Sequence, residues 1–219
     1  MRIRRVLWGV GMVAVLGTGA GCAHSAADRA ERQGERVGEA FAEKVRFADQ
    51  LALFDQKQIA LGHVALERSN NPEVRRFAQV LIRDHQNHLA DLKTLADSHA
   101  FSLALVDLST QDSAIGGAGF EGAVQGAEKG DKAYDKKTDK QVKKFIKERD
   151  ELASLSGREF DKEFLDRVKD DQENGLDLVD EGLDRYREDT SLALLLSRTT
   201  PVLQGHGLQI KTLDGLIGH

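Results

Sequence analysis

The sequence predicts an all-α fold: an antiparallel four-helix bundle with a flexible glycine-rich insertion and a short extra helix between its second and third helices. Apolar residues recur at alternating spacings of three and four in four long segments, as on one face of a helix. Short breaks join the first two segments and the last two, so each pair must run antiparallel. Glycine gathers between the two pairs, where we expect no fixed structure.

The N-terminus is typical of an export signal. Three arginines at positions 2, 4 and 5 precede an apolar run that ends in small residues before Cys22, the one cysteine of the chain. The run is too short for a membrane span, which needs roughly 20 apolar residues. The order of small residues and cysteine is that of a lipoprotein signal, in which the Cys22 thiol receives the lipid. Gly19 stands where such signals usually have leucine, so cleavage by an ordinary signal peptidase is the alternative.

We therefore expect three parts: a signal peptide over residues 1–21, a tether over 22–40, and a bundle domain over 41–217 that is interrupted by an insertion over 107–138. Removal of the signal takes away three arginines and no acid, which leaves 28 basic against 36 acidic side chains. An acidic domain repels phosphate backbones, so its charge argues against nucleic acid as a partner. A disulfide within the monomer is excluded, because Cys22 has no second cysteine to pair with.

The first pair of helices is predicted from Phe47 to Ala65 and from Pro72 to His99. Pro72 stands where a helix can start, because the N–H that proline lacks would be unpaired there. Residues 142–155 predict the short extra helix. The second pair follows Ser156-Gly157 and breaks near residues 188–190, and Pro201 is expected to bend the last helix.

Each of the four stripes is broken near its middle by polar side chains. These are Gln58, His85 with His88, Gln172 and His206. At 1.5 Å per residue, Gln58 and His85 differ in height by roughly 3 Å, and Gln172 and His206 lie level. Two hairpins that pack face to face would bring these positions into one polar layer.

Two interpretations of this layer compete. His85 and His88 are three residues apart, so their imidazoles share a helix face and, with His206, could bind one metal ion. Because no carboxylate interrupts the stripes, a single zinc or copper ion is favoured over iron. Alternatively, the glutamines and histidines hydrogen-bond to each other and fix the helix register without a ligand. Asp84 and Asp171 flank the layer, either as acceptors that orient an imidazole or as solvated side chains.

Three runs, over residues 69–85, 155–161 and 200–206, resemble the ferritin-like bacterial envelope family known as domain of unknown function 4142. The resemblance covers Phe47 to Ile217 without the insertion and implies a ferritin-like bundle in the cell envelope. Its members usually have glutamates before the Leu-Gly of the first helix, Asp-His in the second and third helices, and Pro-Leu-x-x-His in the fourth.

The chain keeps only part of that pattern. Asp84-His85 and the Pro201 with His206 are present, whereas Gln58 replaces a glutamate and Gln172 replaces a histidine. Amides bind transition metals poorly, so the resemblance predicts the fold and location rather than an activity.

We accordingly expect a non-catalytic, lipid-anchored envelope protein, attached to the outer membrane and facing the periplasm if the source is Gram-negative, with an envelope protein as partner. The alternative is a metal-binding or redox-related bundle that uses His85, His88 and His206. A hydrolase finds little support, because the chain has no Gly-x-Ser-x-Gly, no His-Glu-x-x-His and no phosphate-cradling loop.

Overall fold

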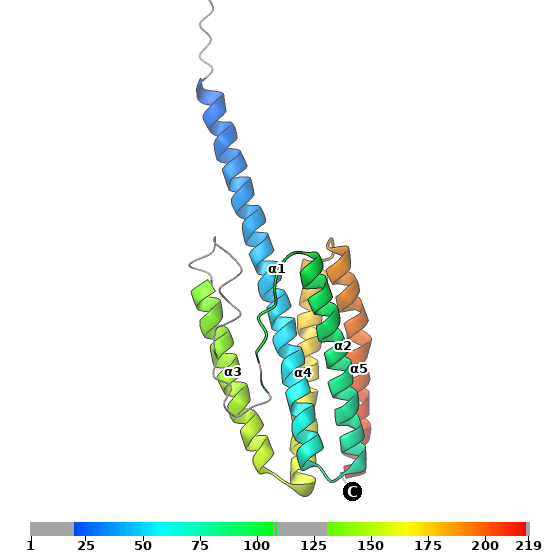
Figure 1. Cartoon of the computed structure of the whole chain (residues 1–219). Helices are drawn as coiled ribbons and strands as arrows, with labels where there is room; N and C mark the ends of the chain where they lie inside the picture. Colours follow the sequence, from blue (N-terminus) through cyan, green and yellow to red (C-terminus); the bar gives the residue numbers. More distant parts are fainter. Residues whose placement is uncertain (1–19, 107, 109–130, 218–219) are drawn as a thin grey trace, which may run out of the picture. The chain divides into compact units, whose positions relative to one another are not determined.

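The computed structural model describes residues 20–106, 108 and 131–217, and its regular structure is helical throughout, which confirms the all-α prediction (Figure 1). The helices are α1 (Ala20–Arg68), α2 (Pro72–Ser98), α3 (Asp131–Ser154), α4 (Gly157–Arg185) and α5 (Thr190–Ile217). None of these helices is both long enough and apolar enough to span a membrane, among the residues described.

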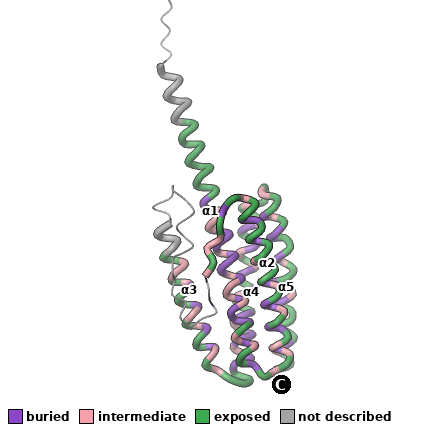
Figure 2. Tube along the Cα trace, in the orientation of Figure 1, coloured by how far each residue is buried: buried purple, intermediate pink, exposed green. Residues whose placement is uncertain are grey.

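Helix α1 begins far earlier than the apolar stripe predicts. It starts at Ala20, so the expected tether over residues 22–40 is helical, and every residue from 29 to 40 is exposed (Figure 2). Alanine, glutamate and arginine dominate this segment, and they are good helix formers even without a face to bury. The chain divides after Ala40 into two compact units, residues 1–40 and 41–219, and the second unit holds the bundle.

The turn between α1 and α2 is fixed by side-chain caps. Asn71 accepts a hydrogen bond from the Glu73 backbone N–H at 2.9 Å, and Pro72 opens α2 as expected. Ser69 is buried and donates to the carboxylate of Asp161 on α4 at 2.5 Å. This end of the first hairpin is thereby tied to the second.

After α2 the chain runs extended beside α1. The Ala104 N–H donates to Asp49 at 2.8 Å, and the Val106 N–H donates to the Gln56 side chain at 3.2 Å. Two α1 side chains, seven positions apart, therefore supply the hydrogen-bond partners that a strand would otherwise give this segment.

The predicted insertion and extra helix differ from the structure in extent. Residues 107 and 109–130 lie outside the described residues, whereas residues 131–138 are already part of α3. Helix α3 has 24 residues and is longer than the expected 142–155. Its apolar side chains Val142, Phe145 and Leu152 are buried against the bundle.

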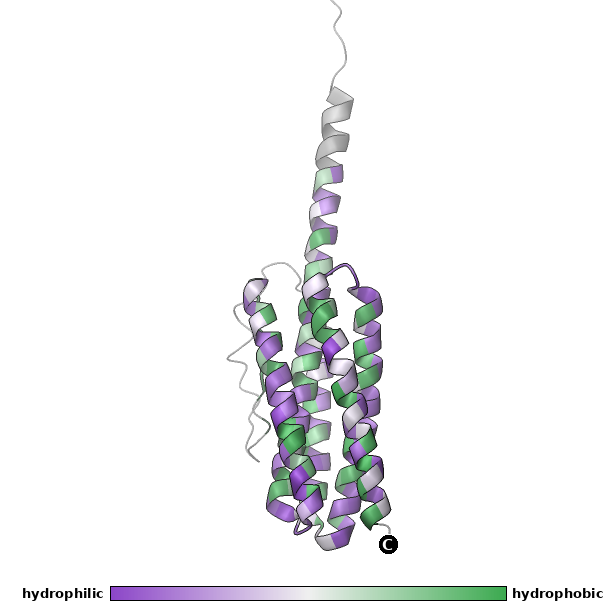
Figure 3. Cartoon of the chain, turned by 90° about the vertical axis from the view of Figure 1, so that its right-hand side faces the viewer, coloured by the Kyte–Doolittle hydropathy of each residue, from purple (hydrophilic) through white to green (hydrophobic). Residues whose placement is uncertain are grey.

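The bundle core consists of two apolar clusters, and every helix alternates hydrophobic and hydrophilic residues around it (Figure 3). One cluster is formed near the α1–α2 turn by side chains such as Phe77, Phe160 and Phe164. The other is formed toward the α4–α5 turn by side chains such as Phe47, Leu92 and Leu196. The polar residues predicted from the sequence lie in the middle, where neither cluster includes them.

Candidate functional site

The buried polar layer crosses the bundle between its two apolar clusters. Gln58 is fully buried, and His85, Gln172 and His206 are at most 2 % exposed. The structure brings these four predicted side chains together, with Gln172 within hydrogen-bonding distance of each of the other three. It also places Asp55, which is fully buried, in the same layer. Unpaired polar groups at this depth would be costly, so the partners of each one decide what the layer can do.

Asp55 on α1 joins the two histidines of α2. One carboxylate oxygen lies 2.8 Å from His85 Nδ1 and the other lies 2.7 Å from His88 Nδ1. A carboxylate only accepts, so both Nδ1 atoms carry hydrogen and donate to Asp55. The pair of imidazoles that the sequence suggested for a metal therefore converges on a carboxylate of the same chain.

Gln172 on α4 is the centre of the other half of the layer. Its amide nitrogen lies 3.0 Å from Gln58 Oε1 and 3.4 Å from His85 Nε2, and its amide oxygen lies 3.0 Å from His206 Nδ1. One side chain thus connects α1, α2 and α5 to α4. An amide is suited to this position, because it both donates and accepts.

Two aspartates end the network. Gln58 donates to Asp171 at 2.8 Å, so Asp171 orients an amide and not an imidazole. Asp84 lies 3.2 Å from His206 Nε2, which places this carboxylate beside an imidazole. Asp84 also forms an ion pair with the exposed Arg83 at 2.9 Å.

The pKa values of His88 and His206 are displaced in opposite directions. Burial lowers the pKa of His88, but the hydrogen bond and charge of Asp55, helped by Asp91, outweigh it and leave the pKa raised. Burial, together with the nearby His85, lowers the pKa of His206 despite the attraction of Asp84. A singly protonated His206 can donate to Gln172 or to Asp84 but not to both at once.

The imidazole nitrogens do not fit a shared metal site. Both nitrogens of His85 and both of His206 face partners within the layer, so a metal would have to displace these hydrogen bonds. Throughout the described ranges, no group of three His, Cys, Asp or Glu side chains is placed to hold a metal ion. His88 Nε2 is the exception among the layer's nitrogens, because it is buried without a hydrogen-bond partner in the described part of the chain.

His88 faces a small cavity between α2 and α5. The cavity has a volume of about 170 Å³, and its walls include Asp84, Asp91, Thr199 and Leu203. A water molecule needs roughly 30 Å³, so the cavity has room for a few solvent molecules or one small ligand.

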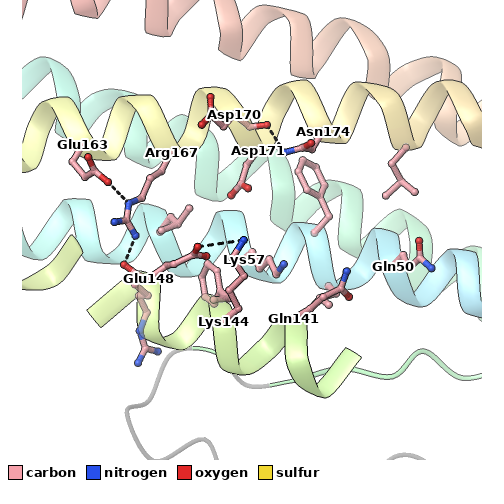
Figure 4. Close-up of a pocket in the computed structure, with 16 residues that line it drawn as sticks. Gln50, Lys57, Gln141, Lys144, Glu148, Glu163, Arg167, Asp170, Asp171 and Asn174 are labelled. Carbon is pink, nitrogen blue, oxygen red and sulfur yellow. Dashed lines mark hydrogen bonds and ion pairs between the residues drawn. The ribbon is translucent and has the colours of Figure 1, made fainter. Parts of the chain in front are cut away.

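The Asp171 end of the layer opens on a larger cleft between α1, α3 and α4, with a volume of about 680 Å³ (Figure 4). The Lys57 ammonium lies in this cleft, 5.8 Å from the centre of the Phe145 ring. Burial lowers the pKa of Lys57, while Asp171 opposes that shift. Burial also raises the pKa of Asp171, against the hydrogen bond from Gln58. The sequence does not predict this cleft, because the cleft depends on where α3 packs.

A glycine makes room for an aromatic neighbour of the layer. The Phe54 ring lies edge-on to His85, with ring centroids 5.2 Å apart. A Cβ at Gly175 would stand 2.5 Å from Phe54 Cζ, so only glycine lets α4 approach this ring.

Cys22 lies within α1, in the part of that helix whose side chains are outside the description. The structure thus brings together His85, His88, His206, Gln58, Gln172, Asp84 and Asp171 in one network, and it leaves the lipidation of Cys22 as a prediction from the sequence.

The family model for the domain of unknown function DUF4142 matches residues 29–213, so the chain belongs to this family. No curated protein matches the chain. The fold is similar to the crystal structure of a DUF305 protein from Streptomyces coelicolor that is described as secreted. That match has a TM-score of 0.55 at 15 % identity and covers 79 % of this chain and 91 % of that one. At this identity the likeness concerns the fold alone.

Proposed function

We propose that this member of the DUF4142 family is a lipid-anchored envelope protein whose bundle is a non-catalytic structural or interaction module. The observation that supports the non-catalytic role is the hydrogen-bond network itself. The polar atoms of its side chains hydrogen-bond to one another, except His88 Nε2, which has no hydrogen-bond partner among the described residues. A catalytic group needs an atom free to reach a substrate, and the central positions of this layer offer none.

The network role can be tested with His85→Ala. This change leaves Asp55 and Gln172 each without one partner, so the free energy of unfolding should fall by about 2–4 kcal/mol. The loss should be the same in buffer with chelator and in buffer with added zinc or copper, when urea unfolding is followed by circular dichroism. A loss that appears only when metal is present would show instead that His85 binds metal.

The anchor is proposed from the leader and Cys22, and the secreted description of the structural neighbour agrees with export. Growth of an expressing bacterium with an alkyne-labelled fatty acid should label the full chain and place it in the membrane fraction. Cys22→Ser should remove both the label and the membrane association. A Cys22→Ser protein that is still labelled, or an unlabelled wild-type protein, would refute lipidation.

A metal-binding function is the second candidate, and one observation favours it. Asp55 holds His88 by Nδ1, which is how carboxylates usually orient a metal-ligating histidine, and His88 lines the cavity between α2 and α5 with its Nε2 buried and without a hydrogen-bond partner among the described residues. The raised pKa of His88 opposes this function, because metal binds the neutral ring. Zinc titration by calorimetry separates the candidates: binding that His88→Ala abolishes and His206→Ala preserves would establish this site.

A further inference from the structure

The solvent face of α5 differs in chemistry from that of its neighbour α4. Both helices have 14 exposed residues, and 12 of those on α4 are charged, whereas on α5 only Arg198 and Lys211 are. Large apolar side chains take the place of the charges. Leu194 is 49 % exposed, Val202 38 %, Leu208 69 % and Leu216 63 %. Apolar side chains aligned along one charge-poor surface indicate a contact with another molecule.

The four apolar positions form a symmetric ridge. Leu194 and Leu216 each lie 11 residues from Gly205, and Val202 and Leu208 each lie three residues from it. With 3.6 residues per turn, all four point within about 60° of the direction of Gly205. A Cβ built at Gly205 would meet nothing within 4 Å, so the centre of the ridge is an open notch.

We propose that this α5 ridge binds the α5 ridge of a second copy of the chain, antiparallel, with the two-fold axis at Gly205. In this arrangement Leu194 faces Leu216 of the second copy, and Val202 faces its Leu208. The two Gly205 residues meet on the axis, where the lack of side chains lets the helices approach closely. Such a contact is isologous, since each copy offers the same surface.

The charge on the ridge selects the antiparallel direction. Arg198 lies seven residues before Gly205 and Thr212 lies seven after it, so the antiparallel pair places each arginine opposite a threonine. A parallel pair in register would place Arg198 against Arg198, and like charges that face each other across an interface are unfavourable.

The size of the ridge predicts a weak dimer. The 28 residues of α5 span about 42 Å, and a contact strip about 10 Å wide gives about 400 Å² per copy. A standard protein interface buries about 800 Å² per partner. We therefore expect a reversible dimer that forms at protein concentrations on the order of 10–100 µM.

Disulfide trapping tests the geometry in the full chain carrying Cys22→Ser, which removes the natural thiol. Gly205→Cys should cross-link with itself on mild oxidation. Neither Leu194→Cys nor Leu216→Cys alone should do so, whereas a mixture of the two should give the cross-linked heterodimer. Self-cross-linking of Leu194→Cys would show a parallel pair and overturn the proposal, as would the absence of any product from the mixture and from Gly205→Cys.

Sedimentation equilibrium supplies an independent test without cysteines. Leu208→Glu buries a charge in the contact and should make the protein monomeric up to about 100 µM, with an unchanged circular dichroism spectrum. Leu105→Glu is the matched control, since Leu105 is 45 % exposed and lies outside α5, and it should dimerise like the wild type. A wild-type chain that stays monomeric over this range, or a dimer that Leu208→Glu leaves intact, would refute the α5 contact.

Discussion

The polar layer has two halves, one around Asp55 and one around the amides of Gln58 and Gln172, and they stabilise buried polar groups in different ways. Between α1 and α2, the Asp55 carboxylate accepts from two imidazoles and holds a buried charge. Among α1, α4 and α5, the amides of Gln58 and Gln172 join His206 without a fully buried carboxylate. A buried charge that loses its partners lowers the free energy of unfolding far more than a buried amide that loses its partners. Mutations in the Asp55 half should therefore be the more destabilising.

Removal of the carboxylate should give the largest effect. Asp55→Ala leaves the Nδ1–H groups of His85 and His88 without an acceptor, and we expect the free energy of unfolding to fall by about 3–5 kcal/mol. Asp55→Asn is the matched control, because its amide oxygen can still accept from one ring. Urea unfolding of both variants measures the difference, and an Asp55→Ala protein as stable as the wild type would show that Asp55 is not needed in the layer.

The next largest loss of stability is expected at the contact between α4 and Phe54, the neighbour of Asp55. Gly175→Ala would force the Phe54 ring away from its place beside His85, which should cost about 1–3 kcal/mol. Gly34→Ala is a suitable control, because a Cβ there meets nothing within 4 Å and the exposed helix should gain slightly. Equal thermal midpoints for Gly175→Ala and the wild type would mean that Phe54 has a second position of equal energy.

Removal of an amide from the other half of the layer should destabilise the fold less than removal of the Asp55 carboxylate. Gln172→Leu keeps the approximate volume of the side chain but removes its hydrogen bonds to Gln58, His85 and His206, at an expected cost of about 1–3 kcal/mol. A loss greater than that of Asp55→Ala in the same urea experiment would show that the Asp55 half is not the more sensitive one.

The two histidines should also respond oppositely to pH. The folded pKa of His88 is raised, so its contribution to stability is complete below its unfolded pKa near 6.5 and is lost as the pH rises through the folded value. The folded pKa of His206 is lowered, so its contribution is complete above about 6.5 and is lost as the pH falls toward the folded value. NMR titration of the ring protons should show His88 titrating above His206, and Asp55→Asn should lower the His88 midpoint. The opposite order would contradict the arrangement of charges in the layer.

The sequence predicts the half of the layer formed by Gln58, Gln172 and His206 better than the Asp55 half, and the reason is geometric. Gln58, Gln172 and His206 each interrupt an apolar stripe, as do His85 and His88 beside Asp55, so the helical period alone places them inward. Asp55 is the member of the layer that the stripes do not predict. Asp55 follows Phe54, and the spacing of the stripe is satisfied by either residue. A signal existed: Asp55 lies four residues after Leu51 and three before Gln58, hence on the same face. Because charged residues are seldom buried, the sequence alone favours Phe54 over Asp55 as the inward-facing residue.

Other features depend on contacts that a local pattern does not contain. The exposed start of α1 has helical propensity without an apolar stripe, so the stripe predicts this helix only from Phe47 onward. The support that Asp49 and Gln56 give to residues 104–106 depends on where the chain returns after α2. The length of α3 likewise follows from good helix formers in residues 131–141 that precede its first buried side chain.

The claim that the polar layer is a hydrogen-bond network and not a metal centre is tested most directly by metal analysis of the full chain, purified without chelator or affinity nickel and then incubated with zinc, copper or iron. Gln58→Glu with Gln172→His provides the positive comparison, because it restores residues typical of the family at these two positions. We expect no stoichiometric metal in the wild type and the same unfolding curve with and without each ion, while the double variant gains metal. One equivalent of metal in the wild type, lost in His85→Ala with His206→Ala, would contradict it.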